Sequence, residues 1–374
     1  MIESFKLQNF RCFSALELTN LKRVNVITGA NSSGKSALLE ALLCAARGTP
    51  DALLVTNALR SVGIIGPHNF RALWDHLFYA AKGYGIQRTA DKIEFNYIDT
   101  DQNKYSVEIK FAELGPIPQP QPQPSVIGRS AGLSTEAPTP LLISRSVTSA
   151  DGDPENTSTN ITLNSQGQIQ GSSIVSNLGP AVFLFSSVMD YAEVDNVVWF
   201  SQLRQKGMHK ELVRFIRDQF PFIADIEVLA PFGSSGLFAS LKSGGVRRLQ
   251  LISSGINKII TILLACANAT NGVILVDEIE NGIFYEKYEF MWSVLYKFAQ
   301  RFSCQLFVTS HSLECLQNLA PVIGDNVDDF SLIRTERQNG KCIAYQISGA
   351  AMAAALSGKN EIRGATVGDT RNYS

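Results

Sequence analysis

The alternation of apolar and polar residues predicts strands at the start of the chain. Residues 4–10 alternate around Phe5 and Leu7, and residues 15–18 can pair with them as a second strand. Residues 23–28 (RVNVIT) form a β-branched run that is typical of a buried strand. Residues 37–47 then contain helix-forming residues without a breaker. The predicted order is therefore strand, glycine-bearing loop and helix.

A change in composition divides the chain into residues 1–111, 112–180 and 181–374. Residues 91–111 predict a hairpin around the turn-forming sequence DTDQN. Eight of the 14 prolines then lie between residues 116 and 154, and no aromatic residue occurs from 112 to 182. We expect 112–180 to be a partly flexible insertion, with an extended spacer at 116–124 that could alternatively dock a proline-binding partner. Within it, residues 161–169 predict a short hairpin.

The third part alternates predicted strands and helices. Apolar runs predict buried strands at residues 181–185, 273–276 and 305–309. Helical spacing predicts helices at 210–220, about 256–269, and 285–301. Strands that alternate with helices are typical of the α/β fold class.

Composition limits the kinds of partner that the chain can bind. Lys plus Arg is 33 and Asp plus Glu is 34, a net charge of -1. This balance excludes a protein that holds nucleic acid by bulk charge alone, although a local basic groove remains possible. The N-terminus has no signal-peptide layout, none of the six cysteines forms a CxxC pair, and the apolar runs are too short to span a bilayer. We therefore expect a soluble cytoplasmic protein with no membrane association.

Residues 29–36 (GANSSGKS) match GxxxxGK[ST] at each fixed position. The glycines let successive amide groups face a phosphate, and the dipole of the following helix attracts the same anion. We expect Lys35 to reach the β- and γ-phosphates of ATP and Ser36 to bind Mg²⁺. The predicted nucleotide-binding residues of this loop are Asn31, Ser32, Ser33, Gly34, Lys35 and Ser36.

Two acids follow the apolar run at 273–276. A buried parallel strand delivers its last side chains to the edge of the sheet where ligands bind. We expect Asp277 to hold Mg²⁺, directly or through water, and Glu278 to orient and polarise the attacking water. An isolated pair of this kind would be interpreted as a solvated surface pair, but the phosphate loop upstream favours the catalytic interpretation.

A serine-glycine turn and a histidine complete the candidate site. Ser253 or Ser254 can cap the predicted helix, and the free N–H groups around Gly255 can also hold a γ-phosphate. His311 follows the strand at 305–309, where it can contact the γ-phosphate or the attacking water.

This order of motifs resembles the ABC-type ATPase heads of the RecF, SMC and Rad50 group. Residues 5–13 (FKLQNFRCF) resemble their opening strand, with Arg11 where that group has a basic residue near the nucleotide. Residues 277–282 (DEIENG) and 309–315 (TSHSLEC) are very similar to the stand-alone bacterial ATP-binding proteins called AAA15 or AAA21, relatives of the ATPase part of OLD-family nucleases. The resemblance implies a P-loop NTPase head of ABC type with a mixed β-sheet and a lid-like insertion.

In such heads two subunits sandwich two ATP molecules. The resemblance therefore implies a homodimer, or a higher oligomer, in which Ser253, Ser254 and Gly255 act in trans. The signature sequence is ISSGI rather than the LSGGQ of transporters, so either serine remains a candidate for the phosphate contact. Phe284 stands where close relatives often carry His.

Three functional hypotheses follow. The first is an ATP-driven dimerisation switch that controls a separate effector, a nuclease or toxin encoded nearby, in bacterial anti-phage defence or DNA metabolism. The stretch after His311 is shorter than the roughly 100 residues of an appended nuclease domain, which favours a separate effector. The second is a RecF-type DNA repair ATPase, which keeps DNA as a possible partner. The third is a non-catalytic, nucleotide-dependent scaffold.

Overall fold

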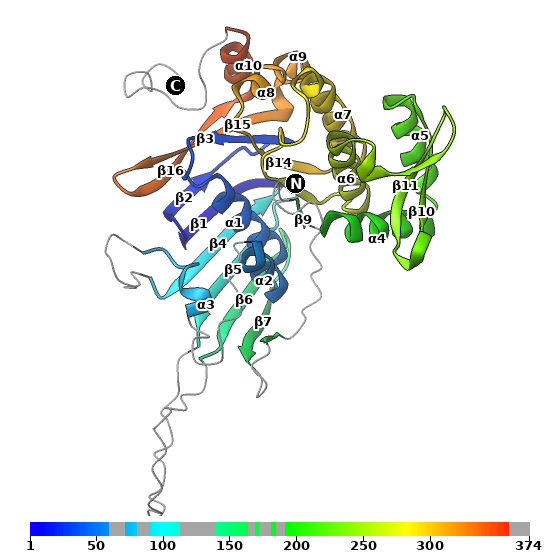
Figure 1. Cartoon of the computed structure of the whole chain (residues 1–374). Helices are drawn as coiled ribbons and strands as arrows, with labels where there is room; N and C mark the ends of the chain where they lie inside the picture. The colour runs from blue at the N-terminus through cyan, green and yellow to red at the C-terminus, as the bar shows by residue number, and fades with distance from the viewer. Residues whose placement is uncertain are drawn as a thin grey trace, which may run out of the picture.

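The structure is a computed structural model that describes residues 1–59, 72–80, 90–112, 139–163, 169–171, 181–184 and 191–358. Its strands form three sheets, with helices packed between and beside them (Figure 1). The predicted α/β class with a mixed sheet is confirmed. Within the described residues, no helix has both the length and the apolar composition that crossing a membrane requires.

The first sheet has seven antiparallel strands in the order β2-β1-β4-β5-β6-β7-β8. Its strands are β1 (Ile2–Phe10), β2 (Phe13–Leu18), β4 (Lys92–Asp99), β5 (Lys104–Phe111), β6 (Leu141–Thr148), β7 (Pro154–Leu163) and β8 (Ile169–Gly171). The predicted pairing of residues 4–10 with 15–18 and the predicted hairpin at 91–111 are confirmed. The hairpin predicted at 161–169 has its two strands paired, while residues 164–168 between them lie outside the described residues. Residues 112–180, expected as an insertion, contribute β6, β7 and β8 to this sheet, while the proline-rich spacer at 116–124 lies outside the described residues.

The second sheet has six strands in the order β16-β15-β3-β14-β13-β9. They are β3 (Val24–Gly29), β9 (Ala181–Leu184), β13 (Val273–Val276), β14 (Gln305–Thr309), β15 (Phe330–Gln338) and β16 (Lys341–Ser348). All neighbours are parallel except β15 and β16. These two form a hairpin whose turn residues Asn339 and Gly340 have φ of 50° and 81°, as a tight Asn-Gly turn requires.

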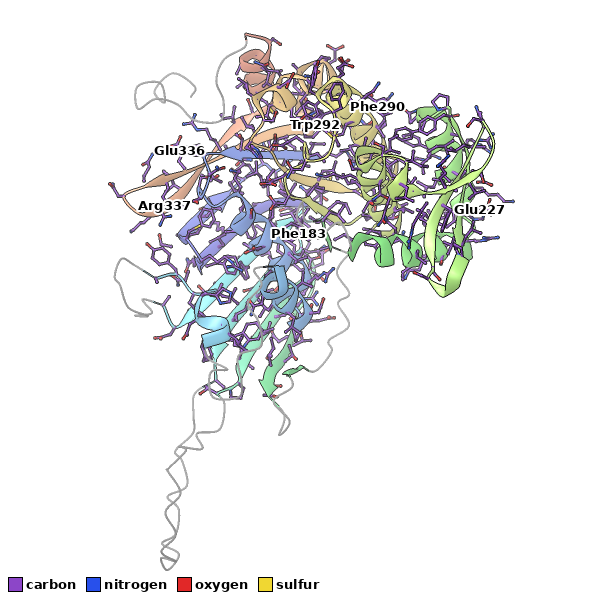
Figure 2. The ribbon with its side chains drawn as sticks, in the orientation of Figure 1. Phe183, Glu227, Phe290, Trp292, Glu336 and Arg337 are labelled. Carbon is purple, nitrogen blue, oxygen red and sulfur yellow. The ribbon has the colours of Figure 1, made fainter. Side chains whose placement is uncertain are left out.

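A third, three-stranded sheet and the helices complete the fold. The sheet consists of β10 (Ile223–Leu229), β11 (Gly236–Leu241) and β12 (Val246–Arg248). The helices are α1 (Lys35–Arg47), α2 (Pro50–Leu59), α3 (Ala72–Asp75), α4 (Tyr191–Gln205), α5 (His209–Gln219), α6 (Ser254–Asn268), α7 (Tyr288–Arg301), α8 (Leu313–Gln317), α9 (Ala320–Ile323) and α10 (Gly349–Ser357). Figure 2 shows Glu227 on this small sheet and Glu336 and Arg337 on the β15–β16 hairpin, at opposite sides of the molecule.

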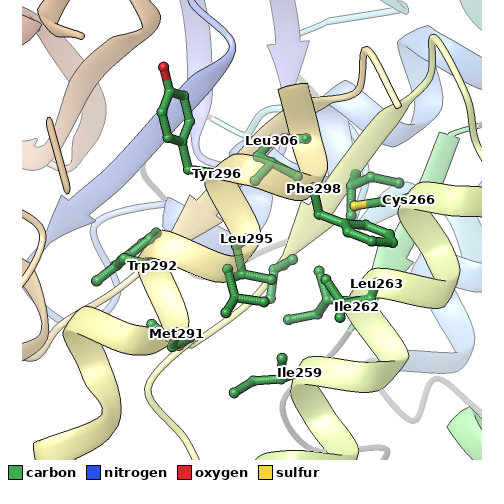
Figure 3. Close-up of a cluster of buried hydrophobic side chains, with 14 of the residues drawn as sticks. Ile259, Ile262, Leu263, Cys266, Met291, Trp292, Leu295, Tyr296, Phe298 and Leu306 are labelled. Atoms are coloured by element: carbon green, nitrogen blue, oxygen red, sulfur yellow. The ribbon is translucent and has the colours of Figure 1, made fainter. Parts of the chain in front are cut away.

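Both faces of the second sheet are buried, which explains its uninterrupted apolar strands. Ile27 and Leu275 face the layer that contains α1 and the first sheet, whereas Val26 and Ile274 face the layer that contains α6 and α7. In the second layer, Ile259, Ile262 and Leu263 of α6 pack against α7 (Figure 3). The sheet and α6 are therefore held rigidly, and the site lies at the ends of these elements.

Candidate functional site

The loop that joins β3 to α1 has a wrapped backbone that only particular residues allow. Gly29 and Gly34 have φ of 147° and 103°, and Ser32 has φ of 61°. A Cβ on Gly29 would lie 2.2 Å from the Thr335 carbonyl oxygen, and one on Gly34 would lie 2.8 Å from Cζ of Phe13. Both glycines are thus required by backbone angle and by space, and the loop has the shape in which amide groups bind a phosphate.

Lys35, the first residue of α1, folds back over the same loop. Its Nζ donates to the carbonyl oxygens of Gly29, at 2.8 Å, and Ala30, at 3.0 Å. Burial lowers the pKa of Lys35, and the carboxylates of Asp277 and Glu278 act in the opposite direction. The ammonium group is therefore held where a loop-bound phosphate would meet it.

Ser36 contacts the end of β13 through Asp277. The Ser36 hydroxyl donates to Asp277 Oδ2 at 2.9 Å, and the Thr309 hydroxyl donates to Oδ1 at 2.5 Å. Hydroxyl and carboxylate oxygens are the ligands that Mg²⁺ prefers, and it is commonly held by one or two carboxylates together with substrate phosphates. Ser36 and Asp277 therefore fit Mg²⁺. In the described part of the chain, no group of three His, Cys, Asp or Glu side chains offers another metal site.

Glu278 has a left-handed backbone with φ of 49°. Its N–H group donates to the Thr309 hydroxyl at 2.7 Å, and its carbonyl oxygen accepts from Nζ of Lys258 at 2.6 Å. Its side-chain Oε2 accepts from Nδ2 of Asn281 at 2.5 Å. Hydrogen bonds thus fix both the backbone and the carboxylate of the candidate base.

His311 is oriented by Glu280. Oε1 of Glu280 accepts from the N–H groups of His311 at 2.8 Å and Ser312 at 3.1 Å, and it also lies 3.1 Å from His311 Nδ1. Glu280 is buried while the imidazole is half exposed. A carboxylate at Nδ1 fixes the orientation of the imidazole ring.

The signature serines have different contacts. Ser253 caps α6 by accepting from the N–H group of Ile256, whereas the Ser254 hydroxyl donates to the Gly282 carbonyl oxygen at 3.1 Å. A Cβ on Gly255 would lie 2.9 Å from that same carbonyl oxygen. The start of α6 therefore packs directly on the segment that follows Glu278.

The Arg11 side chain packs against α1 through an ion pair with Glu40. Its Nε lies 2.5 Å from Oε2 of Glu40, which is almost fully buried, and its guanidinium lies 5.5 Å from the centre of the Phe10 ring. A contact between Arg11 and a nucleotide stays a prediction.

The structure thus joins residues that are far apart in the sequence. The phosphate loop contacts Asp277, His311 contacts the Asp277–Gly282 segment through Glu280, and the signature contacts it through Gly282. Sequence reasoning missed several residues that hold this arrangement, namely Lys258, Glu280, Asn281, Thr309 and Thr335. Thr309 had a usable signal, because it ends the strand predicted at 305–309, which pairs with β13 in the structure. Thr335 belongs to β15, which the sequence patterns did not single out.

Comparison with known families and curated proteins gave two matches. Residues 24–316 match the AAA21 family, which is described as an AAA domain, putative AbiEii toxin, type IV TA (toxin–antitoxin) system. The uncharacterized protein MJECL10 of Methanocaldococcus jannaschii is 48% identical over 42 residues, which is 11% of this chain and 19% of that protein. This chain therefore matches about a fifth of that relative's length.

Solved SMC heads have a similar fold. An SMC head bound to the C-winged helix domain of ScpA has 14% identity and a TM-score of 0.51, and the match covers 93% of this chain and 98% of that one. The SMC head domain from Thermotoga maritima has 14% identity and a TM-score of 0.47, over 93% and 99% of the two chains. The first of these shows that the chain has the fold of an ABC-type ATPase head.

Proposed function

This chain belongs to the AAA21 family, and we propose that it hydrolyses ATP with Mg²⁺ and acts as an ATP-driven dimerisation switch. The observation that carries the proposal is the contact between Ser36 and Asp277. It brings the end of the phosphate loop to the strand end that carries the candidate base, as nucleotide hydrolysis requires.

The residues of the site have separable roles in this proposal. The N–H groups of Asn31, Ser32, Ser33 and Gly34 bind phosphate oxygens, together with the N-terminus of α1. Lys35 neutralises charge on the β- and γ-phosphates, and Ser36 and Asp277 hold Mg²⁺. When bound, the metal ion neutralises charge that develops on the phosphate oxygens. These groups position ATP for attack.

Hydrolysis is then assigned to two further side chains. The Glu278 carboxylate orients the attacking water and accepts its proton. His311, oriented by Glu280, donates from Nε2 to the γ-phosphate or holds the water. Glu278 is the residue whose loss stops turnover while leaving the phosphate loop intact.

The switch follows from contacts that only a complete γ-phosphate allows. In a dimer, the start of α6 with Ser253, Ser254 and Gly255 binds the γ-phosphate held by the other subunit. Because this contact exists only with ATP, binding favours the closed dimer and hydrolysis removes that preference. The same dimer makes two active sites.

Turnover and binding measurements on two variants test the proposal. We expect Lys35→Ala to abolish ATP binding, because it removes the cation of the loop. We expect Glu278→Gln to bind ATP normally and to lose at least about a hundredfold in kcat, as for loss of a general base. Wild-type turnover by Glu278→Gln would contradict the role of this residue.

We propose an effector protein as the partner of the switch. The family description names a toxin of a type IV TA system, and the solved SMC head is bound to a domain of another protein. The effector would be a nuclease or toxin encoded nearby, in a defence or DNA-metabolism system. ATP turnover with and without DNA tests the alternative of a RecF-type repair ATPase. Undetectable turnover with intact ATP binding would instead favour a non-catalytic scaffold.

A further inference from the structure

A buried lysine connects the signature helix to the candidate base. Lys258 lies in the second turn of α6 and is only 5% exposed. Its Nζ donates to the carbonyl oxygen of Glu278 at 2.6 Å and to that of Asn281 at 3.2 Å. A buried ammonium group is costly unless hydrogen bonds compensate for the lost water. These two bonds therefore fix Lys258 and the 278–281 segment against each other.

The segment needs such a restraint at Glu278. A left-handed backbone is unfavourable for a residue with a side chain, and it persists only where surrounding contacts over-determine it. At Glu278 the Thr309 hydroxyl accepts from the N–H group, while Lys258 donates to the carbonyl oxygen. Both ends of the unfavourable conformation are thus held, one by β14 and one by α6.

The helix that carries Lys258 is a stiff element. The next residue, Ile259, and one turn later Leu263 pack in the buried layer between α6 and α7 (Figure 3). At the start of the same helix, Ser254 donates to the carbonyl oxygen of Gly282. A displacement of the signature serines would therefore move Lys258 and, through it, the backbone of Glu278.

We propose that Lys258 is a positioning residue that holds the backbone of Glu278 and couples it to the signature helix of the same chain. The inference rests on the proposed function, because it assumes that Glu278 is the base. A consequence of this role is that the two active sites of the dimer influence each other. When the signature of one subunit binds the γ-phosphate of its partner, α6 adjusts the base in its own subunit, so the two active sites are coupled through a contiguous set of contacts.

Steady-state kinetics on Lys258→Met test this role. Met keeps the length and apolar stem but cannot donate to the two carbonyl oxygens. We expect kcat to fall roughly tenfold or more, because small displacements of a reacting group have effects of this size. The KM for ATP should change less than about twofold, since the phosphate loop is not touched.

A matched control separates positioning from helix stability. Thr261, also buried on α6, donates to the Asn257 carbonyl oxygen and accepts from Asn196, and both contacts lie away from Glu278. Thr261→Val therefore weakens α6 without touching the base, and it should leave kcat near the wild-type value. If Thr261→Val lowers kcat as much as Lys258→Met does, the positioning role is wrong. Lys258→Gln, which keeps a donor, should lose less activity than Met and provides a second variant if Met does not fold.

A double-mutant cycle with Glu278→Gln decides the inference. If Lys258 acts through Glu278, adding Lys258→Met to Glu278→Gln should lower the residual rate by less than about twofold. An undiminished tenfold loss in that background would overturn the proposal, as would wild-type kcat in Lys258→Met alone. Wild-type turnover by Glu278→Gln would instead contradict the proposed function, so the two failures are distinguishable.

Discussion

The buried ammonium group of Lys258 makes the stability of the protein depend on pH. Burial lowers the pKa of Lys258 from 10.5 to about 8, and the carboxylates of Glu280, Glu278 and Asp277 oppose the change. Cys315 also faces this group, but burial raises the pKa of its thiol to about 12, so it stays neutral over the same range. Between pH 8 and 10.5 the unfolded chain therefore binds a proton at this lysine that the folded chain has lost. The free energy of unfolding must rise with pH in this window, because the unfolded state binds more protons.

The expected change in the free energy of unfolding follows from the pKa shift of Lys258. Each pKa unit corresponds to about 1.4 kcal/mol, so a lowering from 10.5 to about 8 corresponds to about 3 kcal/mol. The cost of burying the charge is fully present below the folded pKa of about 8 and is relieved as the pH rises to the unfolded pKa of 10.5. Because the rest of the protein can also respond to alkaline pH, the informative quantity is the difference in stability between two proteins.

Urea unfolding of the wild type and Lys258→Met provides that difference. The free energy of unfolding is measured for both at about pH 7.5 and at about pH 10.5, near the two pKa values that bound the transition. We expect the stability of the wild type relative to Lys258→Met to rise by about 3 kcal/mol between the two conditions. A difference that stays constant with pH would show that Lys258 is not buried as a titrating group, and it would refute the reasoning.

Two further predictions test the phosphate loop and the orientation of the histidine. Gly29→Ala should abolish ATP binding, measured by titration with a fluorescent ATP analogue, because its Cβ would meet the Thr335 carbonyl oxygen at 2.2 Å; wild-type affinity would contradict the geometry of the loop. Glu280→Gln should lower kcat roughly tenfold with little change in ATP affinity, since a neutral amide orients His311 less firmly. Unchanged single-turnover rates in Glu280→Gln would show that the carboxylate is not needed to orient the imidazole.

Local sequence patterns were sufficient to predict the strands and the loop that carry the candidate site. The phosphate loop, the apolar run before Asp277 and the strand before His311 each have a strong signal, and the structure has β3, β13 and β14 at these places. Parallel strands also made the proximity of loop and acids predictable, because their carboxyl ends meet at one edge of a sheet.

Other features depend on contacts between distant segments. The left-handed backbone of Glu278 is held by the side chains of Lys258 and Thr309, which are 20 and 31 residues away in the sequence, and no local pattern encodes these contacts. The strands β6 and β7 lie in a segment that is poor in aromatic residues. Its polar side chains are typical of a strand with one solvated face, but they are equally typical of a linker, so the composition does not distinguish the two. The sequence around Lys258 likewise has only the pattern of an apolar helix, which does not indicate a contact with the candidate base.

The oligomeric state of Glu278→Gln with and without MgATP tests the central claim most directly. We predict that light scattering gives a mass near that of the 40.9 kDa monomer without nucleotide, and about twice that mass with MgATP. Lys35→Ala should stay at the monomer mass under both conditions. A Glu278→Gln protein that binds ATP and remains a monomer would contradict the dimerisation switch.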